Sequence, residues 1–380
     1  MKKFFPYLLL AVSFLFAACD SEEAAIEQEL QSMTLREKVG QLFIIRPEAL
    51  DPEAWYDSPT DLKQLSLQSL NERMVRTATE YPMGGIILFS NNIRDEAQLA
   101  DFVSDLRSLP SHPLLCIDEE GGTVARLANN PNFRVPKFPD MAALAAPGRP
   151  KDVYEAASAI GTYLIKYGFD INFAPVADVN TNPRNIVIGS RAFSTDPKQA
   201  AEMVKNYLKG LQSTGVIGCM KHFPGHGDTQ ADTHFGYAMS RKNWAEIDDC
   251  EMVTFRAGIS AGAKMIMTAH ISLPNVTGSN IPSTLSPMIL QDKLRGELGF
   301  DGVIITDAME MGAIIRQFAV EDACVMAIKA GVDVLLCVRE YPKVFDTIVA
   351  AVRRGEIPES RIDESVRRIL KLRHQAPAHE

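Results

Sequence analysis

The stretch LGFDGVIITDAMEMGAI, residues 298–314, contains the pattern that decides the fold. Gly299 follows a helix-like segment and suits the left-handed backbone position at which many helices end. The run Val303–Thr306 comes next, and its apolar residues are continuous rather than alternating, which is typical of a parallel strand buried on both faces. Asp307 follows at once. The stretch therefore predicts a buried strand of a parallel sheet that ends in a polar residue.

The same pattern recurs along the chain. Eight short apolar runs predict strands: Leu42–Ile45, Gly85–Phe89, Leu114–Ile117, Ile171–Val176, Val216–Met220, Lys264–Thr268, Val303–Thr306 and Val332–Val338. Helices are predicted between and after them: Leu65–Glu80, Asp101–Ser108, Asp152–Tyr167, Pro197–Ser213, Trp244–Ala261, Pro287–Leu298, Glu321–Ala330, Val344–Arg354 and Glu359–Lys371. Asp196 before Pro197 predicts a helix start, and Gly168, Gly215, Gly299 and Gly331 predict helix ends. Eight alternations favour a single (β/α)8 TIM-type barrel of class α/β over an open doubly wound sheet.

The first residues have the composition of a targeting segment. Lys2 and Lys3 precede an apolar run, residues 4–18, that is too short to cross a bilayer comfortably. The sequence LFAAC at 15–19 resembles a bacterial lipobox, in which Cys19 is lipidated and becomes the new N-terminus, and an uncleaved membrane anchor is the alternative. The chain is therefore divided into a signal peptide (1–18), a solvated tether (19–31) and the barrel (32–380). Both alternatives predict an exported protein held in the cell envelope.

Charge and cysteine content narrow the possible partners. Residues 1–18 contain two lysines and no acidic residue, so the remaining body has a net charge of −11. Such a body repels nucleic acid and anionic lipid heads, and attachment to a membrane is expected only through lipidated Cys19. Five further cysteines, an odd number without a short repeated spacing, argue against a disulfide framework. Cys116, Cys219 and Cys337 lie in apolar runs and are expected to be core residues.

A polar residue follows each predicted strand. In a barrel these positions meet at the carboxyl ends of the strands, where such folds place their sites. The set is Arg46, Asn91, Asp118, Asp178, Lys221 with His222, His270, Asp307 and Arg339. Loop starts are polar in most proteins, so each position alone has an ordinary explanation. Together, the eight predict a pocket for a polar, multiply hydroxylated ligand.

The densest group of chemical residues is the loop KHFPGHGDTQADTH, residues 221–234. His222 and His226 have the i, i+4 spacing of a helical metal site, but the proline and glycines between and after them prevent a helix, which disfavours metal binding. Asp232 and His234 are two residues apart and share a face of an extended segment. A carboxylate beside an imidazole fixes its tautomer and raises its pKa, which makes a usable proton donor.

Asp307 has two interpretations from the residues alone. A carboxylate directly after a strand can cap a helix formed by residues 308–312. The same position suits a carboxylate nucleophile. Both remain open at this point.

Longer blocks resemble a known family. They are KHFPGHGDTQADTH (221–234), GGIILFSNNI (84–93), IDEEGGTVARL (117–127), NFAPVADVN (172–180), IGSRAFSTDP (188–197), MTAHI (267–271) and LGFDGVIITDAMEMGAI (298–314). In this order they resemble the family 3 glycoside hydrolases of the β-N-acetylglucosaminidase type, over about residues 30–370.

The resemblance implies a role for each matching position. Asp307 matches the nucleophile, His234 the acid/base and Asp232 its orienting partner. The residues that match those holding the N-acetylglucosamine unit are Asp118, Arg126, Arg191, Lys221 and His222. Thr123, Glu119 and Thr233 stand where many members have Arg, Gln and Ser, which puts the preference for the leaving group in doubt. No metal or organic cofactor is implied.

The function implied is retaining hydrolysis of terminal β-linked N-acetylglucosamine from peptidoglycan-derived or chitin-like fragments. The lipoprotein-like start favours cell-wall material, and a monomer is expected. Two alternatives remain. Phosphate could replace water, which would make the chain a phosphorylase on the same scaffold. The chain could also be a glycan-binding lipoprotein without catalysis.

Overall fold

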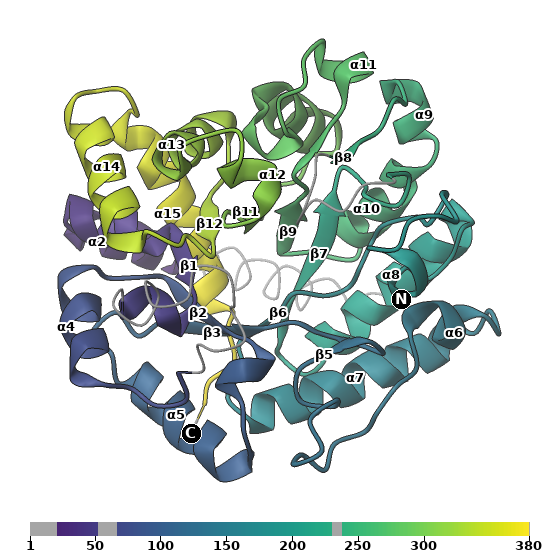
Figure 1. Ribbon diagram of the computed structural model, residues 1–380, viewed down its shortest axis with the longest axis horizontal. Coiled ribbons are helices and arrows are strands. Elements are labelled where there is room, and N and C mark those ends of the chain that lie inside the picture. The colour runs from purple at the N-terminus through teal and green to yellow at the C-terminus, as the bar shows by residue number, and fades with distance from the viewer. Residues whose placement is uncertain (1–20, 52–66, 230–237, 380) are drawn as a thin grey trace, which may run out of the picture.

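The structure is a computed structural model that describes residues 21–51, 67–229 and 238–379. Eight parallel strands pair in the order β1-β12-β11-β9-β7-β6-β3-β2 and close into a barrel (Figure 1). They are β1 (Phe43–Ile45), β2 (Gly85–Leu88), β3 (Leu114–Ile117), β6 (Ile171–Asn172), β7 (Ile217–Phe223), β9 (Met265–Thr268), β11 (Val303–Ala308) and β12 (Val334–Leu336). Each of the eight predicted runs supplies one strand. The single-barrel prediction is therefore confirmed, and the open doubly wound sheet is wrong.

Burial along the strands explains the continuous apolar runs. Every residue of the barrel strands is buried, except Asp307 and Ala308 at the carboxyl end of β11. One face of each strand packs inside the barrel and the other packs against helices, so both faces are mostly apolar. The strands thus form a closed core with accessible polar groups at one end.

Helices cover the outside of this barrel (Figure 1). The α-helices are α2 (Leu35–Gln41), α4 (Glu72–Glu80), α5 (Glu96–Arg107), α6 (Met141–Ala145), α7 (Pro150–Lys166), α8 (Pro197–Gln212), α9 (Trp244–Asp248), α10 (Glu251–Ser260), α11 (Pro274–Thr277), α12 (Gly312–Ile315), α13 (Val320–Ala330), α14 (Tyr341–Arg353) and α15 (Glu359–His374). Short 3-10 turns are η1 (Pro47–Leu50), η2 (Ser90–Asn92), η3 (Gly189–Arg191) and η4 (Ser283–Leu285), and η5 (Met288–Glu297) is a π-helix. Two small sheets pair β4 (Glu119–Gly121) with β5 (Val124–Ala125), and β8 (Ala238–Met239) with β10 (Ile271–Ser272).

The predicted helix signals act as expected. The Asp196 side chain accepts a hydrogen bond of 2.7 Å from the Gln199 N–H, and Pro197 is the first residue of α8. The four glycines predicted to end helices have φ angles of 79°, 95°, 65° and 118° in chain order. Side chains with a Cβ avoid this backbone region, so glycine is required there.

Three helix predictions are corrected. Helix α4 begins at Glu72, seven residues after the predicted start, because Asn71 caps it by accepting from the Met74 N–H at 2.9 Å. Residues 244–261 form two helices rather than one, because the backbone at Cys250 (φ −122°, ψ −78°) is not helical. This break allows Glu251 to turn inward, where its carboxylate pairs with Lys242. Helix α5 begins at Glu96, five residues before the predicted start, because Asp95 caps it by accepting from the Gln98 N–H at 2.9 Å.

The predicted tether is also corrected over the residues that the structure describes. Residues 21–32 are helical, and Ile26 and Leu30, one turn apart, are buried in the core. Glu27 forms an ion pair of 2.9 Å with Arg367 of α15. The segment therefore docks on the barrel instead of extending into solvent.

The signal peptide, Cys19, Asp232, Thr233 and His234 lie outside the described residues. Among the helices that are described, none has the length and hydrophobicity needed to span a bilayer. The five described cysteines are free thiols, and Cys116, Cys219 and Cys337 are buried as predicted.

Candidate active site

Asp307 lies at the open, carboxyl end of β11. Its Oδ1 accepts a hydrogen bond of 2.8 Å from the N–H of the next residue, Ala308. The strand continues through both residues, and the following helix, α12, begins only at Gly312. Asp307 therefore does not cap a helix, and that interpretation is wrong. The carboxylate instead stands at the mouth of the barrel, where TIM-type folds carry their reactive groups.

A partly buried charge cluster lies at the same end of the barrel, and we define it as Asp118, Glu120, Lys221, Arg126 and Arg191. Lys221 Nζ lies 2.8 Å from Asp118 Oδ1 and 2.5 Å from Glu120 Oε1. Arg126 binds the other oxygen of Asp118 at 3.2 Å. The structure thus brings together four of the five residues matched to sugar binding, although they come from three separate segments of the chain.

Glu120 is the member of this cluster that the sequence analysis missed. Arg191 binds it with two hydrogen bonds, from Nε at 2.9 Å and from Nη2 at 2.7 Å. The sequence did contain a pattern that could have identified Glu120. Asp118 and Glu120 are two residues apart, and residues with this spacing share a face of an extended segment. Glu120 therefore holds Lys221 and Arg191 in place through an ion pair with each of them.

The cluster keeps its members charged at neutral pH. Burial by itself raises the pKa of the Glu120 carboxyl, but Arg191 and Lys221 outweigh this effect and lower the pKa to about 2. Burial likewise opposes ionisation of Asp118, yet Lys221 and Arg126 hold its pKa well below its usual range. Burial would lower the pKa of Lys221, but the two carboxylates raise it overall. Fixed charges of this kind present preoriented donors and acceptors to hydroxyl and amide groups.

The lowered pKa of Glu120 predicts a pH-dependent contribution to stability. A carboxyl whose pKa falls from 4.5 to about 2 on folding stabilises the native state above pH 4.5 and loses that effect as the pH falls toward 2. We expect Glu120→Gln to lower the free energy of unfolding by about 3 kcal/mol at neutral pH, and the gap to wild type to shrink below about pH 4.5. Urea titrations of both proteins between about pH 7 and pH 3 measure this gap. A gap that stays constant across that range would contradict the assignment.

His222 is oriented by a second buried carboxylate, Asp178. The His222 Nδ1 lies 2.7 Å from Asp178 Oδ2, and the His226 N–H donates to Asp178 Oδ1 at 2.6 Å. Because Asp178 binds Nδ1, the Nε2 edge of the His222 ring points to the opposite side. His226 is held by Thr229, and burial lowers the pKa of its imidazole, so that it is neutral at neutral pH.

Glu119 is fully buried and bonded within the protein. Its carboxylate is buried and accepts hydrogen bonds from the N–H groups of Leu127 and Ala128, both at 2.9 Å, and from the Tyr163 hydroxyl at 2.8 Å. A glutamate at this position therefore fixes the backbone that carries Arg126. The departure at residue 119 therefore lies in a buried position, where its carboxylate holds the loop backbone.

His270 supports the end of β11 through contacts of both its ring nitrogens. Its Nε2 lies 3.0 Å from the carbonyl oxygen of Ala308, and its Nδ1 lies 2.9 Å from the Thr284 hydroxyl. Because Ala308 adjoins Asp307, this contact fixes the backbone that carries the Asp307 carboxylate.

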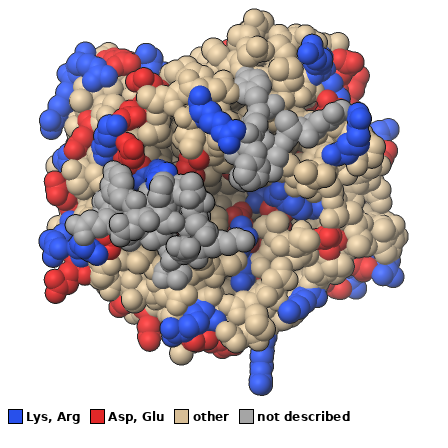
Figure 2. Space-filling view, in the orientation of Figure 1, with Lys and Arg blue, Asp and Glu red and all other residues tan. Residues whose placement is uncertain are grey.

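A second charged network lies beside β1. Arg46 pairs with Glu310 at 3.1 Å and with Glu48 at 3.4 Å, and its guanidinium lies 4.5 Å from the centroid of the Phe89 ring. The face of the molecule in Figure 2 is hollowed near its centre, and charged side chains are visible there. Within the described ranges, no group of three or more His, Cys, Asp or Glu side chains could hold a metal ion.

The geometry agrees with a family match that covers most of the chain. Residues 34–372 match the glycosyl hydrolase family 3 N terminal domain. The chain belongs to this family, which confirms the family expected from the sequence.

The relatives are named for one activity. A Beta-hexosaminidase A of Pseudoalteromonas piscicida is 32% identical over 82% of this chain and 56% of its own length. A Beta-hexosaminidase of Stenotrophomonas maltophilia is 34% identical over 71% of this chain and 80% of its own. A glycoside hydrolase family 3 beta-N-acetylglucosaminidase from Paenibacillus sp. str. FPU-7 has a solved structure with a TM-score of 0.82 and 36% identity, covering 90% of this chain and 63% of that one. The chain thus spans less than two thirds of the first and third of these proteins.

Proposed function

We propose that this chain is a retaining glycoside hydrolase that removes terminal β-linked N-acetylglucosamine. The observation that carries the proposal is the placement of Asp307 at the barrel mouth, at the same end as the charge cluster. The names of the relatives support the choice of sugar. A lone carboxylate beside fixed charges suits chemistry at a polar, hydroxylated substrate.

The proposed reaction has two steps. Asp307 attacks the anomeric carbon and forms a glycosyl ester, while His234 gives its proton to the leaving oxygen as the glycosidic bond breaks. Water then gives a proton to His234 and attacks the same carbon, which releases Asp307. Asp232 orients the His234 ring and stabilises its charged form. In this scheme a histidine takes the role that a second carboxyl group has in most retaining enzymes.

The charge cluster would bind the sugar in this scheme. Lys221, Arg126 and Arg191 are held by carboxylates on one side and can donate to hydroxyl and acetamido oxygens on the other. His222 adds a ring nitrogen on the side opposite Asp178. Such contacts accelerate the reaction where they tighten as the sugar ring distorts toward the transition state.

The substrate source follows from the proposed location. A lipid on Cys19 would hold the barrel in the cell envelope beside the wall, so we propose peptidoglycan-derived fragments as substrates, with chitin-like oligosaccharides as the alternative source. The membrane contact would be the lipid alone, and no nucleic acid would bind to so acidic a body.

Product analysis tests the function. The chain is incubated with an N-acetylglucosaminyl disaccharide in buffer with and without inorganic phosphate. We expect free N-acetylglucosamine of β configuration in both cases. Accumulation of N-acetylglucosamine 1-phosphate would identify a phosphorylase, and binding of the disaccharide without turnover would identify a glycan-binding protein.

His234→Ala is expected to slow the reaction in a manner that depends on the leaving group. An aryl leaving group such as nitrophenolate departs with little proton donation, whereas a sugar alkoxide needs it. We therefore expect kcat/KM to fall about 100-fold or more on a disaccharide and by much less on the nitrophenyl glycoside. Asp228→Asn, a substitution in the same loop, is the matched control, and it should not make the loss depend on the leaving group. Equal losses on both substrates would argue against the acid role of His234.

A further inference from the structure

The amino end of the barrel is covered by α15. Arg368 of this helix lies 3.2 Å from Asp333, the residue just before β12. Further along the helix, Arg373 donates to the carbonyl oxygens of Gly84 at 3.1 Å and His112 at 2.7 Å, which lie just before β2 and β3. Helix α15 therefore spans the amino ends of several strands and forms a layer across this end of the barrel.

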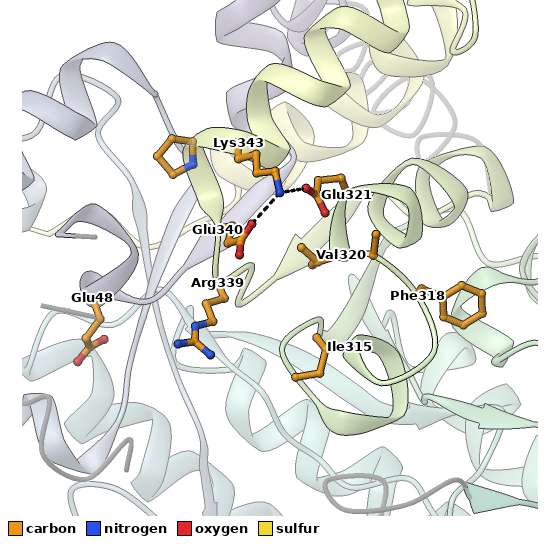
Figure 3. A pocket seen from close by; sticks show the side chains of 10 residues that line it. Glu48, Ile315, Phe318, Val320, Glu321, Arg339, Glu340 and Lys343 are labelled. Atoms are coloured by element: carbon orange, nitrogen blue, oxygen red, sulfur yellow. Dashed lines mark hydrogen bonds and ion pairs between the residues drawn. The ribbon is translucent and has the colours of Figure 1, made fainter. Parts of the chain in front are cut away.

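The active-site mouth lies at the opposite end. A cavity of about 600 Å³ opens there, and its lining residues Glu48, Ile315 and Arg339 follow the strands β1, β11 and β12 (Figure 3). Strand residues rise about 3.3 Å each and a helix is about 10 Å thick, so the carboxyl end of β11, with Asp307, lies roughly 20 Å from the outer face of α15. The two ends of the barrel thus face in opposite directions.

The helix at residues 21–32 is held on α15 by two ion pairs. Besides the pair of Glu27 with Arg367, Glu29 lies 3.0 Å from the Nε2 of His374. These contacts lie two residues apart on the first helix and seven apart on α15. Together with the buried aliphatic face of the first helix, they fix its direction relative to the barrel.

The start of this helix lies at the amino end of the barrel. A cavity of about 280 Å³ separates its first turn from α15, and Glu22 and Glu23 line it together with Asp301 and Arg368. Asp301 stands two residues before β11, and Arg368 binds the residue before β12. The described chain therefore begins at the end of the barrel opposite Asp307.

The docked helix shortens the link to Cys19. A flexible tether over residues 19–31 would have a root-mean-square length of roughly 20 Å and would let the barrel turn freely. With residues 21–32 docked, the Cα atoms of Cys19 and Ser21 are at most about 7 Å apart in any conformation of the chain. A lipid on Cys19 would therefore enter the bilayer close to the amino end of the barrel.

The charges around the smaller cavity are nearly balanced. Arg367, Arg368 and Lys371 of α15 line it, and so do four carboxylates, among them Glu22 and Glu23. The net charge of this lining is −1, against −11 for the body after residue 18. Zwitterionic lipid headgroups carry a phosphate and an ammonium group, which attract the cations and the carboxylates respectively. This surface can lie against such headgroups with little repulsion.

We propose that the amino end of the barrel, formed by residues 21–32 and α15, is the surface that faces a bilayer of zwitterionic phospholipids. The inference rests on the proposed lipid at Cys19, which supplies the attachment. The docked helix decides the orientation, so the active-site mouth opens away from the membrane, toward the wall.

Amine acetylation measures the orientation without any substitution. The lipidated chain is added to vesicles of phosphatidylethanolamine and phosphatidylcholine and treated with a water-soluble active ester, and mass spectrometry follows two exposed lysines, Lys371 of α15 and Lys198 of α8. Lys198 lies on the mouth side, because α8 begins where the chain returns from the carboxyl end of β6. Relative to an unlipidated body of residues 20–380, acetylation should slow about 3-fold or more at Lys371 and less than about 1.5-fold at Lys198.

Two variants test the role of the docked helix. Ile26→Asp together with Leu30→Asp places carboxylates in its buried face and should undock it. A flexible insertion of about 15 glycine and serine residues after Asp20 lengthens the link without touching the barrel. Both should remove the difference between Lys371 and Lys198, while turnover of a soluble aryl glycoside shows that the barrel is folded. Val75→Asp on α4, where Val75 is 40% exposed, is the control and should keep the difference.

The outcomes separate the orientation from the function and from the lipid. Equal slowing at both lysines, greater slowing at Lys198, or a difference that survives the flexible insertion would overturn the proposal. Slowing at Lys371 in concentrated protein without vesicles would identify a second copy of the chain as the occupant instead. The measurement needs no turnover. If Cys19 carries no lipid, the proposed location fails, and a body coupled through the Cys19 thiol to a maleimide-bearing phosphatidylethanolamine still decides the orientation.

Discussion

Asp307→Asn is expected to abolish turnover, lowering kcat on an aryl N-acetylglucosaminide by at least about 10,000-fold. The amide has the same size as the carboxylate, and its oxygen can still accept from the Ala308 N–H, so the fold should persist. The amide is a poor nucleophile and forms no glycosyl ester. Steady-state kinetics with a nitrophenyl glycoside measures the loss of kcat, and thermal unfolding of both proteins shows whether the fold persists.

Covalent labelling identifies the residue directly. A 5-fluoro N-acetylglucosaminyl fluoride should form a slowly hydrolysed ester, and peptide mapping should place it on Asp307. Asp301→Asn is the matched control, since Asp301 is an exposed carboxylate just before the amino end of the same strand, and this variant should label and turn over as wild type does. A label on another residue, or normal turnover by Asp307→Asn, would remove Asp307 from the mechanism.

The barrel could be predicted because its signals are local. Each strand is buried on both faces, so each appears in the sequence as a short continuous apolar run. The glycines that end helices, such as Gly331, are required by a backbone conformation that other residues avoid. The docked helix at residues 21–32 was missed because its acidic start suggested a solvated segment, whereas its burial depends on contacts with α15, far along the chain.

The site could be predicted in part. Strand ends identified Asp118, Lys221 and Asp307, because a barrel brings these ends together whatever lies between them. Glu120 was missed since its role depends on the approach of Lys221 and Arg191 from other segments. A cavity lined by Glu48, Ile315, Arg339 and Lys343 could not be predicted either, because its walls come from the segments after three strands and from helices α12, α13 and α14, and no local pattern indicates how these meet.

Lys221→Met is expected to lower both stability and activity by large amounts. Lys221 is 3% exposed and lies between a buried carboxylate, Glu120, and a partly buried one, Asp118, so its removal leaves these two negative charges with less compensation. Removing one partner of a buried ion pair lowers the free energy of unfolding by about 3–5 kcal/mol. We also expect kcat/KM to fall about 1,000-fold in the folded fraction, because the sugar loses a fixed donor and Asp118 loses its position. Urea unfolding and steady-state kinetics measure the two effects.

Two further variants separate the structural effect from the functional one. Lys38→Met removes a lysine with two carboxylate partners, Glu359 at 3.1 Å and Asp363 at 2.7 Å, between α2 and α15. It should reduce stability while the folded protein keeps wild-type kcat/KM. The double variant Asp118→Asn with Lys221→Met removes both charges of one pair, so it should regain part of the lost stability without regaining activity. Recovery of activity in the double variant would show that the cluster only supports the fold. If Lys221 binds the sugar, the removal of Asp118 can restore stability but cannot supply the donor that was lost with the lysine.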